Sequence, residues 1–522
     1  QVGDGWRESV NAFNPLYTTL WIQDNPIDLT TKTPIHHEQN LSLKDGVMSR
    51  HSVFEMNGIQ VEIKSSRFVS MLHERVILGT YEICVNQDVV IDLFTGVDVE
   101  IWDIHGPHLE DVKHHEDDYI FVHGITHELK KSVSCLKKTN VYFNFQKKSL
   151  VERDGLILEH IKLKAQAGQS YRFDQYGIIS VDQSFDELIQ QMDKISQQGY
   201  QHILMGHQKA WLEKWKLSDV IIHGDDQAQL ALRYSIYHLL ILSPDIYLNQ
   251  SIPARGISGQ TYKGAVFWDT EIFMLPFYLN TNWQSARQII MYRVLGLKGA
   301  KKKAEYYGFK GAFYAWESQE NGQEACSDYN VIDVFTNRPT RTYFRDKQIH
   351  ISADIVYAMH AYIQRTQDFS ILKDGGLEML IEIARFYMDY GHFSIVKNRL
   401  EFWDVLGPDE YHERIHNNAF TNQMIYMVFE TLLSYERYFE QQQDPYFDQT
   451  VIHLEFQETL ELLKTYYPLV YLQPVKYDFL IEQFDGYDKL KDMDIKSLLD
   501  QRLHPNEYLG GHGLAGDTKM IK

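Results

Sequence analysis

Residues 264–279 read GAVFWDTEIFMLPFYL and place Trp268, Asp269 and Glu271 inside an otherwise apolar, aromatic run. Burying ionisable groups among such neighbours costs free energy unless a partner or a ligand compensates them. One interpretation is the start of a core helix that Asp269 caps. The other is the wall of a binding site, and the stretch by itself leaves both open.

The length and charge of the chain narrow the classes of protein. A chain of 522 residues is too long for one hydrophobic core, so two or more domains are expected. Its formal net charge of -20 disfavours nucleic acid or an anionic membrane surface as the main partner. No apolar run approaches the length of a membrane span. We therefore expect neither nucleic acid nor a membrane among its partners.

The cysteines and the N-terminal residues bear on the compartment. Cys84, Cys135 and Cys326 are odd in number, far apart and form no CxxC motif. Such spacing favours neither a disulfide framework nor a cysteine zinc site. The first residues, QVGDGWRESV, lack the basic and apolar regions of a signal peptide. These features indicate a reducing compartment and predict a cytoplasmic protein.

The order of sequence patterns predicts an α+β multidomain fold. In the first third of the chain, short runs rich in Val, Ile, Phe and Tyr partly alternate in polarity and are separated by turns. Because no helical pattern intervenes, we expect an N-terminal antiparallel β-sandwich over residues 1–182. A helical linker is expected over residues 183–220. Helical spacing and long loops over residues 221–522 favour an α/α toroid.

A second polar stretch, DVLGPDEYHERIHNNAFTN, occupies residues 404–422. Pro408 is compatible with the first turn of a helix that holds Glu410, and an acidic helix start favoured by the macrodipole is one interpretation. His412 and His416 also match the HExxH zinc pattern. A zinc protease needs both histidines on one face of a stable buried helix, whereas this helix would begin just before the pattern. We therefore expect no metal.

A long polar and aromatic loop spans residues 316–348. Loops longer than a connection requires usually carry function. Glu317, Glu320, Arg341 and Arg345 are therefore candidate ligand contacts. The alternative for each of them is a surface ion pair.

Carboxylates far apart in sequence and surrounded by tryptophan and tyrosine are typical of sugar-processing sites. Aromatic rings stack on sugar rings, while acidic, basic and amide side chains bind the hydroxyl groups. Cleavage of a glycosidic bond needs a carboxylic acid to protonate the leaving oxygen, and inversion needs an attacker on the opposite face. The attacker is either water activated by a second carboxylate or phosphate, which needs no general base.

The two motifs together resemble glycoside hydrolase family 65, which includes the maltose, trehalose, kojibiose and nigerose phosphorylases. The resemblance is carried by FWDTEIFMLPFYL at residues 267–279 and GPDEYHERIHNNAFTN at residues 407–422. It covers essentially the whole chain, in the order β-sandwich, helical linker and (α/α)6 barrel. Family members extend further at both ends, so the resemblance implies a fragment whose barrel is truncated.

Residue roles follow from the resemblance where the motifs match. Glu410, in GPDEY, corresponds to the general acid that protonates the glycosidic oxygen. Trp268 and Asp269, in FWDTE, correspond to residues that hold the nonreducing glucose. The C-terminal AGDTKMIK is similar to the start of a motif whose lysine, here Lys522, also binds that glucose.

The activity implied by the resemblance is inverting phosphorolysis of an α-linked glucosyl disaccharide. Inorganic phosphate is a co-substrate, the products are β-glucose 1-phosphate and an acceptor sugar, and no cofactor is expected. The form WESQENGQEACSDYN is closer to the kojibiose and nigerose members than to the maltose members. Two alternatives stay open, a trehalase-like hydrolase of the same family and a non-catalytic carbohydrate-binding fragment. Related phosphorylases lead us to expect a homodimer.

Overall fold

The computed structural model describes residues 8–101, 103, 106–116, 118–244, 250–257, 261–329, 331–332, 338–476 and 479–490. Contacts divide the chain into two compact units. One is Ser9–Leu240, and the other combines Gln1–Glu8 with Ile241–Lys522. Each unit buries hydrophobic residues of its own.

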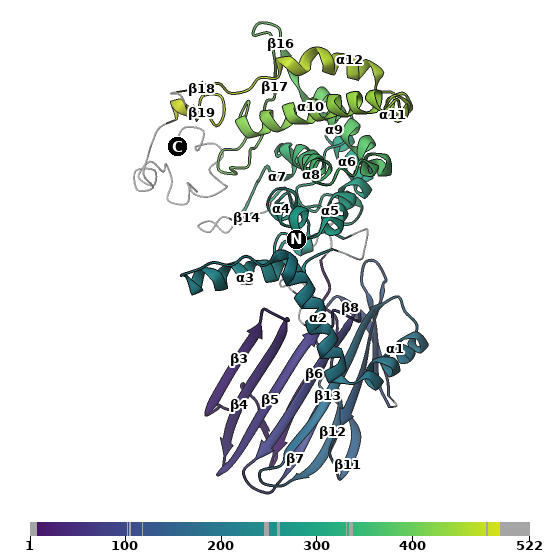
Figure 1. Ribbon diagram of the computed structural model, residues 1–522, viewed down its shortest axis with the longest axis vertical. Coiled ribbons are helices and arrows are strands. Elements are labelled where there is room, and N and C mark those ends of the chain that lie inside the picture. The colour runs from purple at the N-terminus through teal and green to yellow at the C-terminus, as the bar shows by residue number, and fades with distance from the viewer. Residues whose placement is uncertain are drawn as a thin grey trace. The chain divides into compact units, whose positions relative to one another are not determined.

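Two antiparallel sheets form the body of the unit Ser9–Leu240 (Figure 1). Their facing sides share one hydrophobic core, which includes Leu93 and Ile161 from one sheet and Ile63 and Phe173 from the other. The predicted antiparallel β-sandwich is thus confirmed. In spatial order, the five-stranded sheet contains β11 (Lys147–Arg153), β12 (Leu156–Ala165), β7 (Val89–Asp98), β1 (Asn14–Ile22) and β2 (Asn25–Ile27). The eight-stranded sheet contains β3 (His36–Ser42), β4 (Val47–Met56), β5 (Ile59–Val69), β6 (Val76–Val85), β13 (Ser170–Val181), β10 (Ser132–Val141), β9 (Ile120–Thr126) and β8 (Leu109–Glu116).

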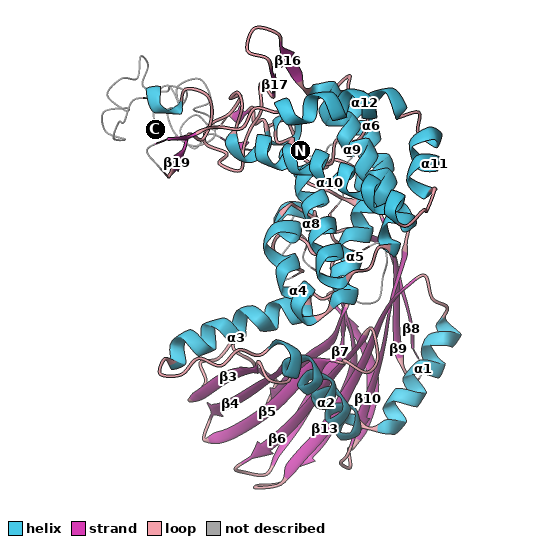
Figure 2. Cartoon of the chain, turned by 45° about the horizontal axis from the view of Figure 1, so that its top comes forward, coloured by secondary structure: helices cyan, strands magenta, loops and turns pink. Residues whose placement is uncertain are grey.

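Helices α1 (Phe185–Gln198) and α2 (Tyr200–Ser218) cover part of the outer face of the eight-stranded sheet (Figure 2). Helix α1 begins at a capping box between Ser184 and Glu187. Gly199, with a φ of 80°, separates the two helices and interrupts the helical pattern seen in the sequence. Leu188 of α1 and Ile203 of α2 join one buried cluster with residues of the sheet. Helix α3 (Asp226–Ile241) follows along the chain.

The other unit consists of helices joined by long loops, as the spacing of its apolar residues predicts. Helix α8 is largely buried and contacts α4, α5, α9 and α10. Across the described ranges, none of the helices combines the length and apolar composition of a membrane span. The helices are α4 (Leu275–Thr281), α5 (Trp283–Leu295), α6 (Leu297–Tyr306), α7 (Phe344–Lys347), α8 (His350–Thr366), α9 (Leu377–Tyr390), α10 (Ala419–Gln441), α11 (Tyr446–His453) and α12 (Gln457–Tyr466).

Short two-stranded hairpins interrupt these helices (Figure 1). Two of them flank the polar stretch at residues 404–422, one before it and one after it in the chain. The hairpins are β14 (Val331–Ile332) with β15 (Pro339–Thr340), β16 (His392–Ser394) with β17 (Arg399–Glu401), and β18 (Val475–Lys476) with β19 (Leu480–Ile481).

A lysine lies buried within the β-sandwich. Lys137 of β10 is 1% exposed, and its Nζ donates hydrogen bonds to Thr95 Oγ1 at 2.8 Å and to the Gly96 carbonyl at 3.1 Å. Gln175 Nε2 donates to the same threonine hydroxyl at 2.7 Å. Burial lowers the pKa of Lys137 to about 7. The folded unit therefore releases this proton at a lower pH than the unfolded chain does.

Replacement of Lys137 by Met tests this buried charge. Between pH 7 and the ordinary lysine range, the unfolded chain binds a proton that the folded chain has released, so Lys137 makes stability rise with pH. We expect Lys137→Met to remove this component from the free energy of unfolding measured by denaturant at pH 7 and pH 9.5. Lys164→Met, at an exposed position on β12, is the control and should keep the wild-type pH dependence. Equal pH dependence in wild type and Lys137→Met contradicts the assignment.

Candidate active site

Trp268 and Asp269 lie where a loop enters a helical segment. A π-helical turn, Thr270–Met274, follows them and leads into α4. Within the described residues, Asp269 makes no capping hydrogen bond with its side chain, so the capping interpretation is wrong. Thr270 Oγ1 instead donates to the Ile252 carbonyl at 2.7 Å and anchors the turn. Asp269 is half-buried, and this burial raises the pKa of its carboxyl group.

A buried ion pair fixes the backbone around Trp268. Glu271 and Arg293 of α5 are both 1% exposed, and the guanidinium donates to the two carboxylate oxygens at 2.8 Å each. Arg293 Nη2 also donates to the Phe267 carbonyl at 3.1 Å. The same guanidinium thus holds residues on both sides of Trp268. The ion pair indicates a structural role for Glu271.

The ring of Trp268 packs against residues from two other helices. Its centroid lies 5.2 Å from that of His350, in an edge-to-face arrangement, and 6.3 Å from that of Phe420. His350 Nδ1 lies 2.7 Å from Asp354 Oδ2, and both side chains are fully buried. The carboxylate therefore fixes the imidazole that supports the tryptophan.

The stretch at residues 404–422 is not helical at Glu410. Residues 402–418 form bends and turns, and α10 begins at Ala419, so the helix expected from Pro408 is wrong. An antiparallel bridge between Val405 and Ile415 closes these residues into a loop. Asn418 provides the actual helix cap, because its side chain accepts a hydrogen bond from the Thr421 amide at 3.0 Å. Glu410 therefore does not lie in the first turn of a helix.

The HExxH pattern also lacks its helix. His412 packs against Phe484 and Tyr487, and His416 Nδ1 accepts a hydrogen bond from the Asp404 amide at 3.0 Å. In the described part of the chain, no group of three or more His, Cys, Asp and Glu side chains is placed to hold a metal ion. Since a zinc protease needs both histidines on one helix face, this stretch does not form that site.

Gln348 contacts the predicted acid. Its Nε2 donates to Glu410 Oε1 at 2.8 Å, and its side chain is 1% exposed. Gln348 follows α7 directly, and His350 begins α8 two residues later. The short segment 348–350 therefore contacts both motifs, Glu410 through Gln348 and Trp268 through His350. Neither Gln348 nor His350 belongs to a recognisable motif in the sequence.

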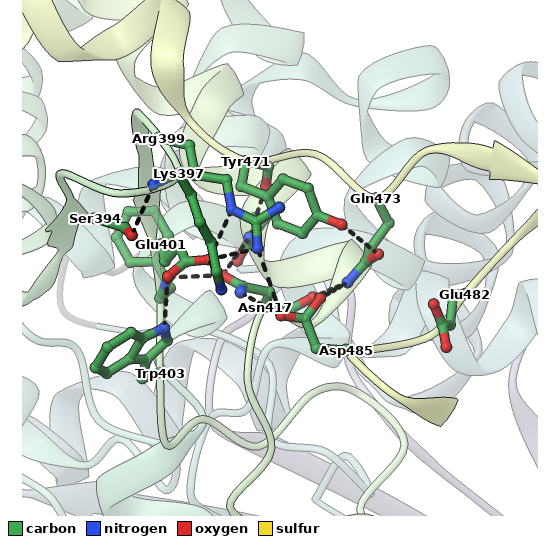
Figure 3. A network of polar contacts seen from close by, with 12 residues as sticks. Ser394, Lys397, Arg399, Glu401, Trp403, Asn417, Tyr471, Gln473, Glu482 and Asp485 are labelled. Carbon is green, nitrogen blue, oxygen red and sulfur yellow. Dashed lines mark hydrogen bonds and ion pairs between the residues drawn. The ribbon is translucent and has the colours of Figure 1, made fainter. Parts of the chain in front are cut away.

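A buried amide and carboxylate network holds the loop that carries Glu410 (Figure 3). The Phe402 amide donates to Asn417 Oδ1 at 3.0 Å, and Asn417 Nδ2 donates to Asp485 Oδ2 at 2.8 Å. Gln473 Nε2 donates to Asp485 Oδ1 at 2.8 Å and to the Asn417 carbonyl at 2.9 Å. Gln483 Nε2 donates to Asp409 Oδ2, directly beside Glu410, at 2.8 Å. Gln473, Gln483 and Asp485 thus fasten the loop from a distant part of the chain.

Cations next to this network are paired with carboxylates. Arg399 Nε lies 2.7 Å and Lys397 Nζ 3.0 Å from Oε1 of the fully buried Glu401 (Figure 3). On the same loop, burial acts to raise the pKa of Asp404. Hydrogen bonds from Arg414 and Lys347 outweigh that effect and hold this pKa at about 2. The carboxylates are therefore ionised at neutral pH, and the pairs stabilise the loop.

The long loop at residues 316–348 is tied down by ion pairs. Glu317, 2% exposed, lies 2.6 Å from Lys263 Nζ. Arg341 lies 2.9 Å from Asp346, and Arg345 lies 3.9 Å from Asp328. These contacts favour the ion-pair interpretation for the three residues. Glu320, the fourth candidate on this loop, is exposed in a short turn. Lys522, which the resemblance assigns to glucose binding, lies outside the described residues.

Comparison with known proteins identifies the family. Residues 3–214 match the N-terminal domain of glycosyl hydrolase family 65, and residues 233–508 match the family's central catalytic domain. The chain belongs to glycosyl hydrolase family 65. Both matched regions agree with the order of sandwich and helical unit described above.

Related proteins include two characterised phosphorylases. The nigerose phosphorylase of Lachnoclostridium phytofermentans is 40% identical over 100% of this chain and 73% of its own length. The 1,2-alpha-glucosylglycerol phosphorylase of Bacillus selenitireducens is 32% identical over 99% of this chain and 68% of its own length. A solved human-microbiome protein, provisionally named a kojibiose phosphorylase, has the same fold, with a TM-score of 0.83 and 23% identity. The match covers 95% of this chain and 65% of that protein.

Replacement of Arg293 by Met tests the anchor below Trp268. Removal of one partner leaves Glu271 as a buried, uncompensated charge, so we expect a loss of about 3–5 kcal/mol in the free energy of unfolding. The double variant Glu271→Leu/Arg293→Met removes both charges and should be less destabilised than the single variant. Denaturant unfolding of the three proteins provides the comparison. A single variant within about 1 kcal/mol of wild type contradicts the anchoring role.

Proposed function

We propose that this chain supplies the β-sandwich and central catalytic region of an inverting disaccharide phosphorylase. The substrate is an α-linked glucosyl disaccharide of the nigerose or kojibiose kind, rather than of the maltose or trehalose kind. The products are β-glucose 1-phosphate and the free acceptor sugar. Membership of glycosyl hydrolase family 65 supports this reaction class, and the names of the two similar phosphorylases support phosphate as the attacking group.

The observation that carries the proposal is the meeting of both motifs at residues 348–350. Glu410 receives a hydrogen bond from Gln348, and Trp268 packs on His350. A carboxyl group near an aromatic ring matches the chemical needs of glycosidic cleavage, in which an acid acts next to a bound sugar. Trp268 offers its ring to the nonreducing glucose, Asp269 binds its hydroxyl groups, and Lys522 adds a further contact.

The proposed step is a single displacement at the anomeric carbon. Glu410, as the carboxylic acid, gives its proton to the glycosidic oxygen while that oxygen leaves with the bonding electron pair. An oxygen of monohydrogen phosphate attacks the opposite face and forms the new C–O bond with inverted configuration. The new ester then loses the proton that phosphate carried to solvent, and a proton from solvent restores the acid form of Glu410. No second carboxylate is required, because phosphate already has a nucleophilic oxygen.

Finer features of the protein belong to the same proposal. The helices of the second unit are part of an (α/α)6 toroid, and the protein acts in the cytoplasm as a homodimer. The three cysteines, Cys84, Cys135 and Cys326, are free thiols, which agrees with a reducing compartment. The relevant boundaries are 1–182 for the sandwich, 183–220 for the helical linker and 221–522 for the catalytic region.

Replacement of Glu410 by Gln in the full-length protein tests the assignment of the acid. The amide has nearly the same shape but cannot protonate the leaving oxygen, so kcat/KM for the disaccharide should fall by about 10²- to 10⁴-fold. Release of glucose 1-phosphate is the measurement. Glu430→Gln, on an exposed position of α10, is the matched control and should retain wild-type turnover. Near-normal turnover by Glu410→Gln refutes the assignment.

The dependence on phosphate separates the proposed phosphorylase from its two alternatives. We expect release of the acceptor sugar from nigerose or kojibiose in phosphate buffer and none in phosphate-free buffer, with glucose 1-phosphate formed in equal amount. Release of free glucose without phosphate identifies a hydrolase. Disaccharide binding measured by calorimetry, without turnover in either buffer, identifies a non-catalytic carbohydrate-binding protein.

A further inference from the structure

The amide of Gln348 has one satisfied atom and one unsatisfied atom. Its Nε2 donates to Glu410 Oε1, whereas its Oε1 has no hydrogen-bond partner among the described residues. The side chain is 1% exposed, so bulk water does not solvate that oxygen. A buried acceptor without a partner is destabilising, because folding removes it from water without replacing the lost hydrogen bond. An amide oxygen kept at such a cost beside a candidate acid points to a use in the reaction.

A general acid presents two different hydrogen-bonding surfaces during turnover. Before proton transfer the carboxylic acid is a donor through its O–H, and afterwards the carboxylate only accepts. A glutamine amide offers both complements, because the NH₂ group donates and the oxygen accepts. Half a turn about the terminal side-chain bond exchanges the two atoms in the same place. One buried amide can therefore contact Glu410 in either protonation state.

We propose that Gln348 is the positioning residue of the general acid and holds the Glu410 carboxyl group in line with the glycosidic oxygen throughout the proton cycle. Its Oε1 accepts from protonated Glu410 while substrate binds. Once the proton has moved to the leaving oxygen, Nε2 donates to the carboxylate, as in the present structure. The inference depends on the proposed function, because it assigns Gln348 a role through Glu410.

The backbone around Gln348 is held firmly enough for this role. The Leu406 amide, from the loop that carries Glu410, donates to the Lys347 carbonyl at 2.9 Å. On the other side, Tyr387 Oη donates to the Ile349 carbonyl at 2.6 Å. Lys347 Nζ also reaches Asp404 Oδ2 at 2.9 Å. These contacts join the Gln348 segment to the Glu410 loop, so that the amide can turn by itself while its attachment stays fixed.

Gln348→Leu, assayed on two substrates in the full-length protein, separates positioning of the acid from general damage. The first substrate is the disaccharide, whose leaving oxygen needs a proton. The second is α-glucosyl fluoride, whose fluoride leaves as an anion without one. We expect kcat/KM for the disaccharide to fall on the order of 10- to 100-fold, because the acid is misplaced. Phosphorolysis of the fluoride should stay within about threefold of wild type, since it does not use the acid.

Gln473→Leu is the matched control for structural loosening. Gln473 is buried and fastens Asn417 and Asp485 of the Glu410 loop, but it has no hydrogen bond with Glu410 among the contacts described. Its loss should lower turnover of both substrates together. If Gln348→Leu behaves the same way, or if its disaccharide turnover equals that of wild type, the positioning role is overturned.

Gln348→Glu provides an independent readout from the pH profile. A second carboxylate beside Glu410 disfavours its ionisation, so the high-pH limb of kcat/KM for the disaccharide should move upward by about one pH unit or more. An unchanged limb overturns the inference even where the leucine variant fails to fold. The proposed function fails separately: disaccharide turnover that survives in Glu410→Gln removes the acid itself, whereas loss in Glu410→Gln with normal Gln348 variants removes only the positioning residue.

Discussion

The hydrogen bond between Gln348 and Glu410 is the contact on which the candidate site depends. Gln348 lies two residues before His350, where α8 begins. A displacement of α8 would therefore move Gln348 together with His350, which supports Trp268. Helix α8 is buried among α4, α5, α9 and α10, which gives the segment a rigid base. The Trp268 ring and Glu410 are therefore both positioned by the segment that begins α8.

Two kinds of interaction keep the motifs in place. Around Trp268 the support is ionic and buried, because Arg293 neutralises Glu271 and also binds the Phe267 carbonyl. Around Glu410 the support comes mainly from side-chain amides. Asn417 and Gln473 both donate hydrogen bonds to the carboxylate of Asp485, and Gln473 also donates to the Asn417 carbonyl. Directional hydrogen bonds of this kind specify one geometry, whereas an apolar contact would tolerate sliding.

The sequence predicted elements whose signal is local. The strands follow from period-two alternation and the helices from apolar spacing, and both depend on neighbouring residues only. The helix at Pro408 is a wrong prediction because its local signal is outweighed by contacts from Gln473, Gln483 and Asp485, which hold the chain in turns. Gln348 and His350 were missed for a related reason. A glutamine and a histidine before an apolar helix carry no motif, and their importance comes from residues 62 positions later and 82 positions earlier.

The distribution of charge bears on how phosphate reaches such a site. With a net charge of -20, the chain as a whole repels a phosphate dianion, so binding requires a local excess of cations. Four cations contact carboxylates on or beside the Glu410 loop, because Arg399 and Lys397 share Glu401, and Arg414 and Lys347 share Asp404. Since two cations share each of these carboxylates, the pairs hold the loop and still leave positive charge beside it. The contacts that stabilise the loop therefore also reduce the local repulsion of an anion.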